Sequence, residues 1–440
     1  MTIFDQIFGN SKPATPAPKI RFGRFSDSYH LAAQDAAFDE AVQAFSRGDF
    51  VDSYKAFFDY LHNAGEENVR VWREKEDIGF ELFQGSKKVT GFANGRKFYA
   101  VAIVARANSL QSSFMRRLLD ENFELKYSRF ALTPANEIAI VFDSYPVDSS
   151  PYKLYAALKE LATHADKHDD LLIDEFDALE PTDINIRRHL PQAEKETKYR
   201  YIKREIETDF GILDNGKLHP GQYATGFTYL LLYLCYKLDY LTKPEGYMME
   251  TLERIHRLAF AKDGKNVAQK NLTIRKEFQK LLDRPQEKFF KEMYEVRSTF
   301  GITTPIDHEK LALIIGQELP NMKWYLEQGH EQIALAVPGY IVSFSLFYYA
   351  LPAPDKEFFH LLLQIIEHTY FDELGFRSFV RNGRLEKKAI CHEISGITER
   401  HCKACPHMQP DVKMLVWNSL PQFAESYLHM VRTLDLSGCA

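Results

Sequence analysis

The sequence has few cysteines and no excess of positive charge, and each shortage argues against a class of protein. Its 55 Lys and Arg residues are outnumbered by 61 Asp and Glu residues, which gives a formal net charge of −6. Nucleic-acid binding is not expected, because neutralisation of phosphates by Lys and Arg supplies most of that affinity. The five cysteines are an odd number, and four of them lie after residue 390. This is not the pattern of a disulfide framework, so we expect reduced thiols or metal ligands.

The N-terminus lacks the features of a secretory signal, namely a basic start, a long apolar middle and a small-residue cleavage site. We therefore expect a cytoplasmic protein. One stretch favours the alternative of membrane association, because residues 333–354 contain no charge and are long enough to cross a bilayer. However, Pro338 and Gly339 are expected to break this stretch early, and no cluster of Lys or Arg flanks it. A buried core helix over residues 340–351 is the favoured interpretation.

The common catalytic motifs are also absent, since the sequence contains no GxSxG, GxGxxG or HExxH. The segment GSKKVTG at 85–91 lacks the GK[ST] ending of a phosphate-binding loop, and we interpret it as a hairpin turn. The segment HADKHDD at 164–170 places His164 and His168 one turn apart, a spacing that can bind a metal. We interpret it as the solvated surface of a helix. Catalysis is therefore not the favoured function, although a triad assembled from distant residues would escape such a search.

The sequence does have enough apolar residues for real cores, at 45% of the chain. Residues 1–30 are predicted to be a flexible apolar peptide with a proline-rich linker, and a helical hairpin is predicted near residues 37–61. From residue 70 the apolar period changes to two. This pattern predicts three or four strands, a helix, two more strands and a long helix with Ser149 or Ser150 as its N-cap and Pro151 at its first position. We therefore expect an α+β fold, with an α/β sandwich on an antiparallel sheet over residues 31–179.

Three segments of this region resemble a known family. They are VTGFANGRKFYAVAIV at 89–104, MRRLLDENFELKYSRFALTPANEIAIVF at 115–142 and ELATHADKHDDLL at 160–172. With the order of predicted elements, they resemble the YbjN-type domain and the class I type III secretion chaperones whose fold it shares, over roughly residues 36–178. The resemblance implies an α/β sandwich, often dimeric, that binds a protein segment and has no chemistry of its own. It brings no catalytic residues.

A polar segment with two prolines at 180–200 is interpreted as a linker, and an all-α domain is predicted beyond it, over residues 201–440. Two stretches, which begin at Gly226 and Gly339, share an aromatic-rich helix, a turn with proline and an amphipathic helix, and we interpret them as a duplicated helix pair. Helices are expected at 197–209, 222–241, 246–261, 271–300, 307–328, 338–351, 355–371, 384–397 and 412–434.

The densest set of potential metal ligands lies in AICHEISGITERHCKACPHMQ at 389–409, which contains a CxxC pair with the spacing of a zinc knuckle. Three interpretations stay open: a structural Zn²⁺ site, no ligand at all, and a dithiol redox pair. The proline that follows the CxxC pair argues against a c-type haem. The expected ligands of a tetrahedral zinc site are Cys391, Cys402, Cys405 and His407, with His401 or His392 as alternatives to His407.

Together these features predict a non-catalytic adaptor or chaperone-like scaffold that binds a partner polypeptide through the α/β domain. Phe92, Phe98 and Tyr99 on the predicted strands are the candidate contacts. A homodimer through the same domain is a further expectation, and no cofactor other than structural Zn²⁺ is expected. The alternatives are an enzyme or effector with its site in the helical C-terminal domain, and a membrane-associated component that uses residues 333–354.

Overall fold

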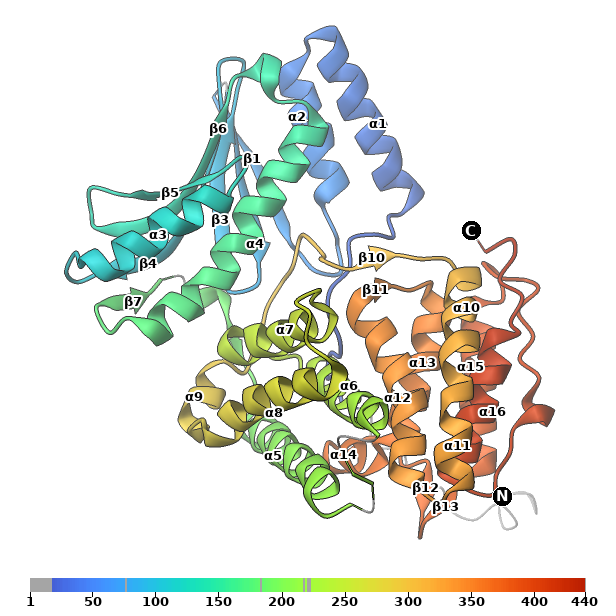
Figure 1. The fold of residues 1–440 in the computed structure, drawn as a ribbon. Helices are drawn as coiled ribbons and strands as arrows, with labels where there is room; N and C mark the ends of the chain where they lie inside the picture. Colours follow the sequence, from blue (N-terminus) through green and yellow to red (C-terminus); the bar gives the residue numbers. More distant parts are fainter. Residues whose placement is uncertain (1–17, 76, 183, 217, 220–222, 440) are drawn as a thin grey trace, which may run out of the picture. The chain divides into compact units, whose positions relative to one another are not determined.

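An antiparallel sheet with flanking helices forms the N-terminal part of the protein, and a largely helical region follows it (Figure 1). The computed structural model describes residues 18–75, 77–182, 184–216, 218–219 and 223–439. The predicted α+β fold is therefore confirmed. The predicted apolar peptide at the start of the chain lies outside the described residues.

In the described part of the chain, seven strands form the main sheet in the order β1-β2-β3-β4-β6-β5, with β7 paired to β4. Every pair is antiparallel. Successive side chains of a strand point to opposite faces, so each face collects alternate residues. The strands are β1 (Val69–Glu74), β2 (Asp77–Gln84), β3 (Lys87–Ala93), β4 (Phe98–Ala107), β5 (Arg129–Leu132), β6 (Glu137–Ser144) and β7 (Leu179–Pro181).

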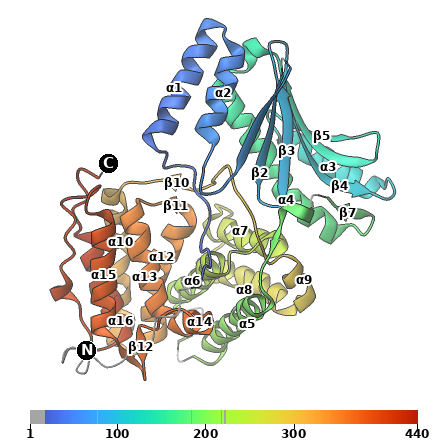
Figure 2. The same ribbon diagram turned by 180° about the vertical axis from the view of Figure 1, so that it is seen from behind.

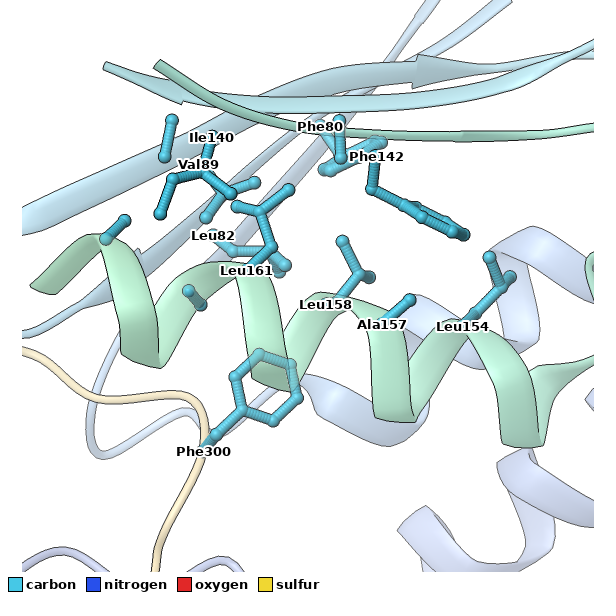
Figure 3. Close-up of a cluster of buried hydrophobic side chains, with 14 of the residues drawn as sticks. Phe80, Leu82, Val89, Ile140, Phe142, Leu154, Ala157, Leu158, Leu161 and Phe300 are labelled. Atoms are coloured by element: carbon cyan, nitrogen blue, oxygen red, sulfur yellow. The ribbon is translucent and has the colours of Figure 1, made fainter. Parts of the chain in front are cut away.

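Three helices lie on one side of this sheet in both views (Figures 1 and 2), and a fourth helix packs beside β5. The three are α1 (Ala32–Arg47), α2 (Phe50–Leu61) and α4 (Pro151–Glu175), and the fourth is α3 (Ser112–Glu124). Helix α4 begins as predicted, because the Ser150 side chain accepts a hydrogen bond from the backbone N–H of Lys153. Its leucines at 154, 158 and 161 recur at helical spacing and pack on the sheet (Figure 3). Burial of each contributes about 1.5–3 kcal/mol.

A segment far along the chain completes this core. Phe300 is buried in the same cluster as the α4 leucines (Figure 3). The backbone N–H groups of Thr299 and Phe300 both donate to the side-chain oxygen of Gln84, at 3.1 and 2.9 Å. Residues near 300 therefore belong to the same packing unit as the sheet.

The described residues pack as two compact units, and the division does not fall at the predicted linker over 180–200. The first unit holds residues 23–307 and 343–352, and the described part of the second holds 18–22, 308–342 and 353–439. Polar residues from Gln192 onward form the start of a long helix in place of a linker. The first unit therefore contains both the sheet and several helices.

The helices of the first unit after α4 are α5 (Gln192–Asn215), α6 (Ala224–Thr242), α7 (Gly246–Phe260), α8 (Val267–Asp283) and α9 (Gln286–Lys291). The single helix predicted over 271–300 is wrong, because Pro285 separates α8 from α9 and the chain is extended beyond Lys291. The later helices are α10 (His308–Glu318), α11 (Met322–Glu327), α12 (Glu331–Tyr348), α13 (Ala353–Ile366), α14 (His368–Glu373), α15 (Lys387–His401) and α16 (Leu420–Arg432).

Short elements join these helices. The two-residue strands are β8 (Arg188–His189) with β9 (Tyr294–Glu295), β10 (Thr304–Pro305) with β11 (Tyr349–Ala350), and β12 (Val380–Arg381) with β13 (Arg384–Leu385). The 3-10 turns are Pro146–Asp148, Ile184–Ile186, Leu319–Asn321 and Val412–Met414.

Helix α12 continues through Pro338, so the helix break predicted there is wrong. A proline inside a helix removes one backbone hydrogen bond and costs about 3 kcal/mol. Complete burial of Val337, Ile341 and Val342 offsets this cost. None of the helices in the described residues is both long and apolar enough to cross a membrane.

The end of the predicted flexible linker is fixed to the first unit. The backbone N–H of Gly23 donates to the carbonyl oxygen of Tyr240 at 2.8 Å. The Arg24 guanidinium donates to both carboxylate oxygens of Asp239, at 2.6 and 2.9 Å. A bidentate pair of this kind is among the stronger side-chain interactions, so residues 23 and 24 are parts of the folded unit.

Candidate functional site

An aromatic row crosses the face of the sheet that points away from α1, α2 and α4. We give this name to Trp72, Phe92 and Tyr99. The register pairs Trp72 with Gly79, Gly79 with Phe92, and Phe92 with Tyr99, so these residues share one face of four adjacent strands. The Phe92 and Tyr99 rings stack with centroids 5.7 Å apart. Both are partly exposed, and Trp72 is 46% exposed.

Glycine at position 79 is what allows this row to form. A Cβ atom at Gly79 would lie 2.4 Å from Cε2 of Trp72, so the indole lies directly over the glycine backbone. Phe98, the third predicted contact, points to the opposite face of the sheet and is fully buried there. The centroid of its ring lies 5.4 Å from that of Phe80. Phe98 therefore belongs to the core, whereas Trp72 joins Phe92 and Tyr99. The period of two in the sequence places Trp72 on this face, but it does not reveal the cross-strand neighbours.

The structure does not gather the four predicted zinc ligands. Cys405 is bonded to Cys439 in a disulfide, Cys402 is exposed, and Cys391 is a free, half-buried thiol on α15. No group of three or more His, Cys, Asp or Glu side chains within the described residues is suited to hold a metal ion. Zinc is therefore not supported. The expectation of reduced thiols or metal ligands is therefore wrong for Cys405, because its partner Cys439 lies 34 positions further on, outside the segment 389–409 whose spacing suggested a zinc site.

A second site lies on α4, in the segment HADKHDD. Its interpretation as a solvated surface is wrong, because Asp169 is fully buried and His168 is only 3% exposed. The carboxylates of Asp166, Asp169 and Asp170 lie on one helix face, as their spacing of three and four residues requires. This face receives the turn between β2 and β3, so both segments singled out in the sequence meet here.

The β2–β3 turn is built to contact these carboxylates. Gly85 has a φ of +55°, and a Cβ there would lie 1.8 Å from Oδ1 of Asp166. The backbone N–H of Ser86 donates to that same oxygen at 2.8 Å, and the Ser86 hydroxyl donates to Asp169 at 2.6 Å. Lys87 is completely buried, with its Nζ atom 3.3 Å from Oδ2 of Asp169. The turn therefore depends on glycine for both its backbone conformation and its close approach to α4.

Two residues from later in the chain complete the network. The Arg187 guanidinium donates to Asp169 at 2.7 Å and lies 3.0 Å from a carboxylate oxygen of Asp170. The Tyr294 hydroxyl donates to the other oxygen of Asp170, and Arg187 lies over its ring at 4.6 Å. Sequence reasoning missed both residues, since nothing local marks them as partners of α4.

A pocket of about 270 Å³ adjoins this network within the first unit. The residues around it come from α4, from the turn between α6 and α7, and from the segments near residues 24 and 300. The lining includes the charged residues Arg24, Asp166, Glu245 and Glu253 and the apolar residues Phe300 and Ile302. A pocket of this size accommodates a small organic molecule.

The pKa values of the carboxyl groups here are raised. Burial, together with the negative charge of Asp169, raises the pKa of Asp166 to about 8. The same two causes raise the pKa of Asp170 to about 6, although Arg187 opposes them. Burial and the neighbouring aspartates also raise the pKa of Glu245 well above its usual value. Asp166 and Glu245 therefore favour the protonated form near neutral pH, whereas Asp170 is mostly ionised there.

No family model matches this chain, and no curated protein matches it significantly. What the structure shares with the domain that the sequence resembles is an antiparallel sheet with flanking helices. A shared architecture of this kind does not define a function, so the function has to be argued from the aromatic row, the α4 network and the pocket.

Proposed function

We propose that the protein is a non-catalytic adaptor whose α/β domain binds a partner polypeptide across the aromatic row. The observation that carries this proposal is the row itself: Trp72, Phe92 and Tyr99 lie side by side on the sheet face opposite α1, α2 and α4. Aromatic side chains are enriched among the residues that dominate protein interfaces, because they bury much area with little loss of conformational freedom.

The surroundings of the row favour a protein partner. Val101 and Ile103, which follow Tyr99 on the same face of β4, are also partly exposed. At the end of the row Lys97 lies 3.1 Å from Asp143 and 5.5 Å from the Tyr99 ring centroid. An apolar centre with charged groups at its edge is the usual composition of an interface.

The resemblance to the YbjN-type domain and the secretion chaperones leads to the same proposal, since it implies an α/β domain that binds a protein segment. The partner of this chain is proposed to be a polypeptide with exposed apolar side chains. A second copy of the chain is the alternative occupant, because the resemblance also implies dimers.

The proposal can be tested by photo-crosslinking of the full chain in its native cell. Benzoylphenylalanine in place of Phe92 should capture one polypeptide in a stoichiometric amount, which mass spectrometry then identifies. The matched control carries the same group in place of Tyr152, which is 65% exposed on α4. Capture at position 152 equal to that at position 92 would refute the proposal, and capture of only a second copy would replace the adaptor with self-association.

A substitution series gives the energetic test. Trp72→Ala, Phe92→Ala and Tyr99→Ala should each weaken binding of the captured partner by about 2 kcal/mol, or about 30-fold in Kd. Tyr152→Ala should leave it unchanged. Unaltered circular dichroism of the variants would show that the loss comes from the interface rather than from unfolding.

A further inference from the structure

The pocket beside α4 contains a buried carboxyl group without a partner. Glu245 is 7% exposed and lines the pocket. Its side chain makes no hydrogen bond or ion pair with any of the described residues, although it stands at the N-cap position of α7, where a side chain can bond to backbone N–H groups. A charged group buried in this way is costly unless something pairs with it.

Like charges surround this carboxyl group. Asp166, Asp169 and Asp170 face it from α4, and Lys243 is the one positive group among the charges that act on it most strongly in the described structure. The combination of burial and like charge favours a proton on Glu245.

Two of the cations that line the pocket, Lys167 and Arg24, are paired with carboxylates other than Glu245. The Lys167 ammonium lies 2.9 Å from a carboxylate oxygen of Glu250. Arg24 is held by Asp239 at 2.6 Å and by Glu253 at 2.9 Å. Lys167 and Arg24 are therefore engaged elsewhere, and Lys243 is the cation of the pocket whose charge acts on Glu245.

The pocket is also lined by apolar side chains, which are Phe25, Met249, Val296, Phe300 and Ile302. A ligand that satisfies both the carboxyl groups and this apolar lining has a positively charged head and a short hydrocarbon body. A bare metal ion does not suit the site, since the described residues offer no group of three ligands for one.

We propose that this pocket binds a small organic cation, an alkylammonium or alkylguanidinium, with its charged head against the carboxylates of Glu245 and Asp166 and its body against Phe300 and Ile302. The cation supplies the positively charged partner that the Glu245 carboxylate does not have within the protein. This site is separate from the aromatic row, so it does not depend on the proposed adaptor function.

Isothermal titration of the full chain with n-butylamine and with n-butylguanidine tests the proposal. Both should bind, whereas 1-butanol, which keeps the hydrocarbon chain of n-butylamine without its charge, and the anion butyrate should not. Glu245→Gln should weaken binding at least ten-fold. The matched control is Glu137→Gln, because Glu137 lies on β6 away from the pocket, paired with Arg106, and its loss should leave the affinity unchanged.

The pH dependence gives a second readout. The carboxyl of Asp166 has a pKa of about 8, and it must lose its proton to pair with the cation. An alkylammonium keeps its charge over this range, since its pKa is near that of lysine, about 10.4. Affinity should therefore rise from pH 6 to pH 8.5, and titrations in buffers of different ionisation enthalpy should detect protons released on binding.

Each failure has a distinct meaning. No binding of either cation at millimolar concentration, equal binding by Glu245→Gln, or binding of 1-butanol would each overturn the proposal. Binding of N-acetyl-lysine methylamide without binding of n-butylamine would replace the free cation with a lysine side chain of a protein. Should Glu245→Gln not fold, Asp166→Asn is the second variant, and it should lose the rise in affinity with pH.

Discussion

The buried pair of Lys87 and Asp169 offers a sharp test of how the α4 network stabilises the first unit. Both side chains are completely buried, and Nζ of Lys87 lies 3.3 Å from Oδ2 of Asp169. The other partners of Lys87 are neutral oxygens of Val104 and Thr182, at 2.8 and 3.1 Å. Asp169 has further partners with strong donors, which are the Ser86 hydroxyl and the Arg187 guanidinium.

This difference predicts unequal costs for the two single substitutions. Asp169→Asn leaves the Lys87 ammonium buried without a carboxylate, which costs about 3–5 kcal/mol. Lys87→Met leaves Asp169 with Arg187 and Ser86, so the expected cost is the loss of one charge-assisted hydrogen bond, about 1.5–3 kcal/mol. With a urea m-value of about 2 kcal/mol/M, Asp169→Asn should lower the unfolding midpoint by about 1.5–2.5 M.

The three tryptophans allow the unfolding of the two units to be followed separately. Trp72 lies in the sheet of the first unit, whereas Trp324 and Trp417 lie in the second. Fluorescence of the double variant Trp324→Phe, Trp417→Phe therefore reports on the first unit during urea unfolding at pH 7. The control is Asp214→Asn, which removes an exposed pair with Arg275 and should cost less than 1 kcal/mol. A larger cost for Lys87→Met than for Asp169→Asn would refute the reasoning.

Three further predictions concern titration and the disulfide. Burial and the charge of a neighbouring aspartate raise the pKa of Asp166 from 3.8 to about 8, so its ionisation destabilises the fold as the pH rises through this window. Asp166→Asn should therefore have the same melting temperature as the wild type at pH 4 and a higher one at pH 8.5. Equal melting temperatures of variant and wild type at both pH values would contradict this. The Cys405–Cys439 bond closes a loop of 34 positions, so Cys439→Ser should lower the stability of the second unit by about 3–4 kcal/mol without reductant. Thiol titration of the unreduced, unfolded wild type should count three free cysteines, and a count of five would exclude the bond. Burial lowers the pKa of His308, but the hydrogen bond and the charge of Asp355 outweigh this and raise it above 6.5. The stabilisation of the fold by protonated His308 is therefore present below pH 6.5 and is lost as the pH rises through the raised pKa. His308→Gln should flatten this dependence in the fluorescence of Trp324 and Trp417, and an unchanged slope would contradict it.

The sheet could be predicted from the sequence because its signals are local. Alternating apolar residues mark both faces of each strand, and the pair Asn94–Gly95 marks a hairpin turn between β3 and β4. The start of α4 was predictable for the same reason, because the cap at Ser150 and the proline after it are adjacent in the chain. What these signals do not specify is which distant segment completes the core, and Phe300 is that segment.

The α4 network shows the same limit in a polar setting. The spacing of Asp166, Asp169 and Asp170 places them on one helix face, which the sequence contains, but acidic residues on a helix face are usually solvated. Their burial follows from partners on other elements: Lys87 lies about 80 positions earlier, and Tyr294 lies 124 positions after Asp170. A single sequence does not reveal such pairs, because only the folded chain brings them within hydrogen-bond distance.

The contrast between Asp169 and Glu245 separates a structural carboxylate from a binding one. Asp169 is buried with four donors, from Ser86, Lys87, Arg187 and the backbone of Asp170, and so contributes to stability, as a satisfied buried charge does. Glu245 is buried near the same aspartates, and its side chain has no hydrogen-bond donor among the described residues, which costs free energy. Functional sites commonly retain groups that destabilise the fold, because the ligand supplies what the protein lacks. The α4 region therefore holds two carboxylates of similar burial and opposite roles, and the presence or absence of a protein donor distinguishes them.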